Sequence, residues 1–126
     1  MKELTKAEEQ IMQYLWKLKK CFLKDIVDIF QEPRPAYTTV STVIRVLVKK
    51  KYIGFKTFGK IHEYYPLVKK SDYFSLHLKT NIREYFNGSV SNFTSFFASD
   101  KDIDISDLEE IKRIIDEQIK IRKKNG

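Results

Sequence analysis

Two prolines, Pro33 and Pro35, interrupt the N-terminal half of this chain and limit how it can fold. Proline lacks the backbone amide that a helix needs, and it pushes the residue before it into an extended conformation. Before this break, apolar residues recur at three- and four-residue spacing over residues 23–30, which predicts a short helix with one buried face. A new element therefore has to begin after Pro35.

The segment that follows, residues 38–50, is rich in β-branched residues and could form a strand or a helix. As a strand, one of its two faces would mix apolar and basic side chains. As a helix, the apolar residues form one stripe, and hydroxyl and basic residues line the other side. The stripe consists of Val40, Val43, Ile44 and Leu47. We therefore predict a helix that Thr38 or Thr39 caps at its start.

Two further elements complete the N-terminal half. A capping box that begins at Thr5 predicts a helix that continues to about Leu18. After the third helix, aromatic and β-branched residues on both sides of Gly59 predict a β-hairpin, with strands near residues 52–58 and 61–68. The expected order is three helices and a hairpin, which is enough for one small hydrophobic core.

The sequence predicts two domains, a first domain of residues 1–70 and a second domain of residues 71–126. Two amphipathic helices are expected here, one ending at Asn87-Gly88 and one opening with a capping box at Ser106. This half has too little surface of its own to bury both apolar faces, so we expect a homodimer; packing on the first domain is the alternative. The expected dimerisation residues are Phe74, Leu78, Ile82, Phe86, Leu108, Ile111, Ile115 and Ile119.

Positive charge is concentrated in the first domain. The chain carries a net charge of +7, and residues 1–70 hold 15 basic residues against 7 acidic ones. Residues 71–126 have nearly balanced charge. Positive charge confined to one module is typical of a protein that binds a polyanion, usually nucleic acid. A solvated lysine-rich surface is the alternative interpretation.

No catalytic or metal-binding motif is recognisable in the sequence. The two histidines, His62 and His77, lie in different elements, and the acidic residues 100–104 lack the glycine and glutamate of a calcium loop. We therefore expect no enzyme activity, no metal site and no cofactor. A single cysteine, no apolar run long enough for a membrane span and no apolar core of a secretory signal together predict a cytoplasmic location.

The hydroxyl-rich side of the helix at residues 38–50 has the composition of a surface that reads DNA. The second helix of a helix-turn-helix enters the major groove, where small hydroxyl side chains permit close approach and one arginine can bind guanine. The residues expected to read bases are Thr38, Thr39, Ser41, Thr42 and Arg45. Those expected to contact phosphates or the minor groove are Lys49, Lys50, Lys56 and Lys60.

Four segments resemble, in order and spacing, the penicillinase-repressor family of the BlaI/MecI/CopY type. They are LTKAEEQIMQYLWKL, AYTTVSTVIRVLVKKKYI, GKIHEYYPLV, and FNG followed by DISDLEEIKRII. The resemblance implies a mainly α-helical chain with a small β-hairpin, divided into a winged helix-turn-helix DNA-binding domain and a C-terminal helical dimerisation domain. It implies a repressor that binds palindromic double-stranded operator DNA as a homodimer. Many members are inactivated when a membrane sensor metalloprotease system triggers cleavage in the dimerisation domain.

Three features depart from the pattern of that family. Lys51 stands where members usually have the glycine that ends the recognition helix. Cleavage in the family falls at an Asn-Phe bond, and the corresponding bond here joins Ser95 and Phe96. The C-terminal cysteines of the copper-responsive branch are absent, so copper sensing is not expected. A winged helix that contacts another protein, without specific DNA binding, is the alternative function.

Overall fold

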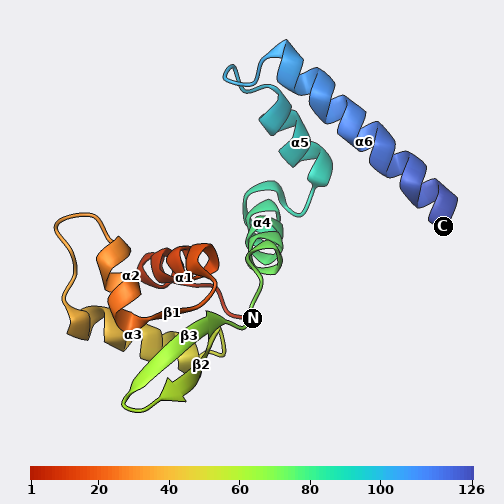
Figure 1. Ribbon diagram of the computed structural model, residues 1–126. Helices are drawn as coiled ribbons and strands as arrows, with labels where there is room; N and C mark the ends of the chain where they lie inside the picture. The colour runs from red at the N-terminus through yellow and green to blue at the C-terminus, as the bar shows by residue number, and fades with distance from the viewer. The chain divides into compact units, whose positions relative to one another are not determined.

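The computed structural model describes residues 1–126, which divide into two compact units. The first unit, Met1–Leu78, contains helices and a small sheet, and the second, Lys79–Gly126, is helical (Figure 1). The boundary falls inside helix α4 (Lys70–Phe86), which therefore contributes to both units. The division expected from the sequence, after residue 70, lies at the start of the same helix.

The first unit contains the predicted helices and hairpin. Its elements are α1 (Lys6–Leu18), β1 (Cys21–Phe22), α2 (Leu23–Ile29), α3 (Tyr37–Lys49), β2 (Ile53–Phe58) and β3 (Ile61–Pro66). The three strands form an antiparallel sheet in the order β1-β3-β2. The two-residue strand β1 was not predicted from the sequence, and it pairs Cys21 with Tyr64 of β3. Helices α2 and α3 with the β2-β3 hairpin make a winged helix-turn-helix, in which the hairpin is the wing.

The starts of the first and third helices differ in how they are capped. At α1 the predicted capping box is confirmed, because the Glu8 amide donates to Thr5 Oγ1 at 3.2 Å and the Thr5 amide donates to Glu8 Oε1 at 2.9 Å. At α3 the expected cap by Thr38 or Thr39 is wrong, since the N-cap is Ala36 and makes no side-chain hydrogen bond. The helix begins directly after the proline break, so both threonines are already inside its first turn.

One hydrophobic core holds the first unit together. Three residues of the predicted stripe on α3 are buried in it, and Val43 packs against its edge. The buried apolar residues are Ile11, Met12, Leu15, Cys21, Ile26, Val27, Val40, Ile44, Leu47, Tyr52, Ile53 and Tyr73. The indole of Trp16 packs against this core and donates a hydrogen bond to the Val68 carbonyl at 2.8 Å. The core fixes α3 against α1 and the sheet, so the opposite side of α3 faces solvent.

Helix α3 ends in a Schellman motif that has a lysine at its left-handed position. The Tyr52 amide donates to the Leu47 carbonyl at 2.9 Å, and the Lys51 amide donates to the Val48 carbonyl at 3.0 Å. Lys51 has φ +67°, a conformation that glycine adopts without strain and lysine does not. The backbone is therefore left-handed at the position where the resemblance implies a glycine.

The second unit consists of the end of α4 together with α5 (Val90–Ala98) and α6 (Ile105–Asn125). The predicted stop at Asn87-Gly88 is confirmed, since both residues have positive φ and α4 ends just before them. The expected capping box at Ser106 is wrong. Asp104 is the N-cap of α6 instead, because its carboxylate accepts the Asp107 amide at 2.8 Å.

Candidate nucleic-acid interface

The solvent side of α3 carries a row of hydroxyl groups that ends in a guanidinium. Thr38, Thr42 and Arg45 are exposed, and Ser41 is half-buried beside them. The Thr42 hydroxyl donates to the Thr38 carbonyl at 2.8 Å, and Arg45 Nη2 donates to Thr42 Oγ1 at 3.4 Å. The helical repeat therefore places four of the five predicted base-reading residues on one side of the helix.

Thr39, the fifth predicted base-reading residue, lies on a different side of α3. Its side chain lines a small cavity of about 180 Å³ together with residues of α1, including Ala7 and Gln10, and with Pro35. It is exposed, but it does not belong to the row that ends at Arg45.

A groove of about 430 Å³ separates the row on α3 from the wing. Ser41 and Arg45 line its α3 side, and Phe55, His62 and Tyr64 line its wing side. The three wing rings contact one another, with the Phe55 and His62 centroids 4.3 Å apart. None of these three was predicted as a site residue. The sequence did contain a pattern that could have identified two of them. His62 and Tyr64 are two residues apart on β3, so their side chains lie on the same face of the sheet.

Arg45 is a positively charged residue in the lining of this groove. Burial raises the pKa of Tyr64, and the positive charge of Arg45 acts in the opposite direction on the same phenol. Arg45 and Tyr64 line the same groove, from α3 and from the wing respectively. Arg45 therefore adds a positive charge to the lining of this groove, which suits a surface for nucleic-acid phosphates and base edges.

The predicted phosphate-binding lysines fall into two groups. Lys49 at the end of α3, Lys56 on β2 and Lys60 at the turn of the wing are exposed. Lys50 is different, because its ammonium donates to both carboxylate oxygens of Glu8, at 2.9 and 2.8 Å, and only 25% of its side chain is exposed. The structure thus leaves three of the four predicted lysines exposed and uses the fourth, Lys50, in an ion pair inside the fold.

The structure shows no group of three or more histidine, cysteine or acidic side chains placed to hold a metal ion.

Burial raises the pKa of the Cys21 thiol to about 12, and the nearby charges of Asp25 and Glu63 contribute less to this shift. The thiol therefore stays protonated near neutral pH. No helix is both long and apolar enough to cross a membrane.

The predicted dimerisation residues lie on α4 and α6, and no apolar side chain after Leu78 is fully buried. Phe74, Ile115 and Ile119 are exposed, and the other five are half-buried. Six further apolar side chains of the second unit are exposed but are not among the predicted dimerisation residues: Tyr85, Val90, Phe97, Ile105, Ile114 and Ile121. The predicted cleavage residues Ser95 and Phe96 lie within α5 and are exposed.

Comparison with known proteins identifies relatives along nearly the whole chain. A sequence profile of the penicillinase repressor family matches residues 4–117. The methicillin resistance regulatory protein MecI of Mammaliicoccus sciuri is 28% identical over 117 residues, which cover 92% of this chain and 95% of the relative. The penicillinase repressor of Bacillus licheniformis is 21% identical over 123 residues, which cover 97% of this chain and 95% of the relative.

A solved structure supports the fold of the first unit. The solution structure of the DNA-binding domain of the repressor BlaI aligns with a TM-score of 0.50 at 23% identity, and the alignment covers 58% of this chain and 94% of that domain. At this identity the match supports the winged-helix fold alone. The family profile, by contrast, extends through both compact units. On that evidence, the chain belongs to the penicillinase repressor family.

Proposed function

We propose that this protein is a DNA-binding transcriptional repressor that binds palindromic operator DNA as a homodimer. The proposal rests above all on the row of Thr38, Thr42 and Arg45, which a winged helix-turn-helix presents to solvent on its second helix. The family is one of repressors.

In this proposal α3 enters the major groove. Thr38, Ser41 and Thr42 are short enough to let the helix approach the base edges, and Arg45 can donate two hydrogen bonds to one guanine. Lys49, Lys56 and Lys60 then neutralise phosphates on either side, which supplies affinity without sequence preference. We assign Lys50 to its ion pair with Glu8 rather than to DNA.

The homodimer is supported by the apolar surface of the second unit. Exposed Ile115 and Ile119 follow one side of α6 together with half-buried Leu108 and Ile111, and exposed phenylalanines lie on α5. Exposed apolar side chains that cluster along helices are typical of an interface between copies. A dimer also matches a palindromic operator, because each two-fold-related half-site then meets one copy of α3.

We also propose that a membrane sensor metalloprotease system relieves repression by triggering cleavage between Ser95 and Phe96. The side chain of Phe96 is 67% exposed, which supports access to this bond. The bond lies inside α5, a helix of nine residues. A helix this short is marginal without tertiary support, so local unwinding of α5 is the step that would admit a protease. Mass spectrometry of the protein recovered from induced cells would identify the cleaved bond.

The experiment that tests DNA binding uses the DNA upstream of the protein's own gene. We expect the folded protein to bind this DNA and to footprint two half-sites about one helical turn, or a multiple of it, apart. If a dimer contacts about 6–10 phosphates, its affinity should fall steeply with salt, by about 10³–10⁵ between 50 and 200 mM. A folded dimer that fails to bind this DNA at low salt contradicts the proposal.

A further inference from the structure

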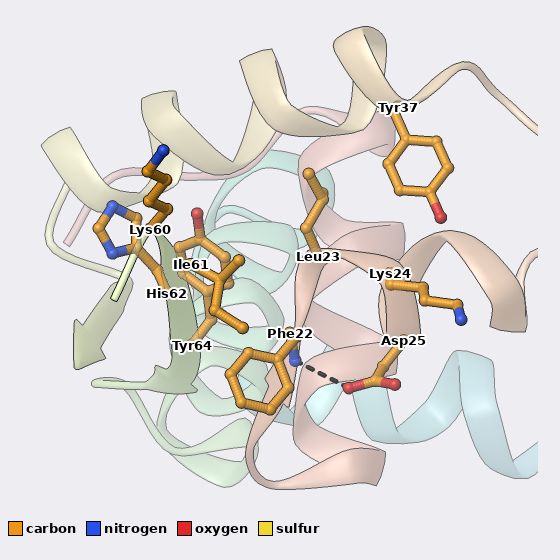
Figure 2. A pocket seen from close by; sticks show the side chains of 9 residues that line it. All are labelled: Phe22, Leu23, Lys24, Asp25, Tyr37, Lys60, Ile61, His62 and Tyr64. Atoms are coloured by element: carbon orange, nitrogen blue, oxygen red, sulfur yellow. Dashed lines mark hydrogen bonds between the residues drawn. The ribbon is translucent and has the colours of Figure 1, made fainter. Parts of the chain in front are cut away.

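A second concavity, of about 480 Å³, lies beside the candidate DNA interface and has a different chemical character (Figure 2). It is formed by the junction of β1 and α2, the first residue of α3 and the strand β3 of the wing. Its lining residues are Phe22, Leu23, Lys24, Asp25, Tyr37, Lys60, Ile61, His62 and Tyr64. The volume is in the range of sites that hold small molecules in other proteins.

The lining of this pocket is mostly apolar. Phe22 and Leu23 are half-buried, and the side chains of Tyr37 and Ile61 remain 49% and 55% exposed. Figure 2 shows Phe22, Leu23 and Ile61 in the middle of the lining. An aromatic or aliphatic body placed there would remove this apolar surface from water, which favours binding.

Two lysines add positive charge to the apolar lining. Figure 2 shows Lys60 on one side of the pocket and Lys24 on the other. Neither lysine belongs to any ion pair of the protein. The one carboxylate of the lining, Asp25, accepts the Phe22 amide at 2.9 Å and is used to cap α2. The pocket therefore offers two uncommitted cations beside an apolar surface.

DNA does not account for such a site. Protein–DNA interfaces are polar, positively charged and hydrated, and a phosphodiester gains nothing from contact with Phe22 or Leu23. The ligand that fits both features has a flat apolar body and an acidic group at its edge. An aromatic carboxylate has this chemistry, because its ring can cover the apolar residues while its carboxylate reaches Lys60 or Lys24.

We propose that this pocket binds a small aromatic carboxylate and that the bound ligand weakens the affinity of the protein for DNA. Lys60 belongs both to the pocket and to the proposed phosphate contacts, and Tyr37 is the first residue of the recognition helix. A carboxylate bound to Lys60 removes that charge from the DNA and adds a negative charge beside the phosphates. The regulatory part of this proposal rests on the proposed function.

Binding is tested on the free protein, with 2-naphthoate as the probe. We expect amide shift changes in ¹H-¹⁵N spectra at Leu23, Lys24, Ile61 and His62, and much weaker binding of the uncharged 2-naphthalenemethanol. Lys60→Ala should weaken 2-naphthoate binding about three- to fivefold, the upper range for one exposed charge pair. Lys56→Ala is the matched control, since it removes a wing lysine outside the pocket, and it should leave this affinity unchanged.

Several results would overturn the proposal. The binding part is wrong if millimolar 2-naphthoate does not bind, or if the uncharged 2-naphthalenemethanol binds as tightly as 2-naphthoate. It is also wrong if Lys60→Ala and Lys56→Ala change the affinity for 2-naphthoate equally, or if the shift changes are confined to the exposed apolar residues of α5 and α6.

Competition with DNA is then measured by adding saturating 2-naphthoate to the protein–DNA complex, where we expect the affinity for DNA to fall at least threefold. Unchanged DNA affinity at saturation refutes the regulatory part. Failure of the free protein to bind DNA refutes the proposed function instead, and the binding test on the pocket still stands.

Discussion

The ammonium of Lys50 donates hydrogen bonds to both carboxylate oxygens of Glu8, from a position 42 residues further along the chain. Glu8 Oε1 also accepts the Thr5 amide in the capping box of α1. One carboxylate thus ties the start of α1 to the end of α3, the helix proposed to read DNA. Only 7% of the Glu8 side chain is exposed, so this pair is more sheltered from solvent than an ordinary surface ion pair.

Breaking this ion pair should destabilise the first unit. We expect Glu8→Gln and Lys50→Met each to lower the free energy of unfolding by about 1–2 kcal/mol, because each leaves a partly buried charged or polar partner without its best hydrogen bonds. Urea unfolding followed by circular dichroism measures the change. The control is Lys49→Met, an exposed lysine in the same turn, which should stay within about 0.5 kcal/mol of the parent protein.

The ion pair of Glu8 with Lys50 also predicts how the free energy of unfolding depends on pH. Burial acts to raise the pKa of Glu8, but the hydrogen bonds from Lys50 and Thr5 outweigh it and hold the pKa below its ordinary value of 4.5. The charged carboxylate therefore stabilises the fold fully above about pH 4.5, and this contribution is lost as the pH falls through the lower pKa of the folded state. Below pH 4.5 the unfolding free energy should fall more steeply for the parent protein than for Glu8→Gln. Parallel pH curves for the two proteins would contradict this assignment.

The left-handed lysine at the end of α3 predicts a stabilising substitution. Lys51 has φ +67°, so Lys51→Gly relieves backbone strain while it adds some disorder to the unfolded chain. We expect a net gain of about 0.5–1 kcal/mol in the free energy of unfolding, measured by urea denaturation. Lys51→Ala keeps the strain and removes the same charge, so it should show no such gain. Equal stability of the Gly and Ala variants would contradict the explanation.

The proposed division between base reading and phosphate contact predicts two kinds of defect. Arg45→Ala should cost about 1–3 kcal/mol on operator DNA and little on unrelated DNA, because it removes a contact to a base edge. Lys60→Ala should weaken both DNAs about equally and reduce the slope of log K against log salt by about 1 for each lysine lost. Fluorescence anisotropy on both DNAs over a range of salt separates the two. An equal loss on both DNAs for Arg45→Ala argues against base reading.

The proposed dimer predicts that a charge on the apolar side of α6 will separate the protomers. Ile115→Glu should weaken dimerisation at least tenfold, because two copies of a side chain worth about 1.5–3 kcal/mol are removed from the interface. Sedimentation equilibrium gives the dimer dissociation constant. The control is Lys120→Glu on the charged side of the same helix, which should leave the constant within about twofold. If both variants dimerise as the parent does, the interface lies elsewhere.

The sequence by itself determined the helices and the hairpin of the first unit and the solvent side of α3. Proline chemistry at Pro33 and Pro35 ended α2, and the three- and four-residue spacing of apolar side chains distinguished a helix from a strand despite the β-branched residues of α3. These are local effects, because they depend on neighbours within about one or two helical turns. For the same reason the sequence identified which side of α3 carries Arg45. Lys51 was singled out by the resemblance to the penicillinase-repressor family, and the structure gives it a positive φ.

Only the tertiary structure decided which residues meet across distant elements. It paired Lys50 with Glu8, turned Thr39 toward α1, and joined Phe22 to the wing to form an apolar pocket. The two-residue strand β1 is too short to show a periodic pattern of apolar residues. It forms because its backbone pairs with the edge of β3. The spacing of apolar residues along the sequence predicts which face of a helix or strand is buried. Which side chain a given charged or aromatic residue contacts depends instead on how the helices and strands pack around the core.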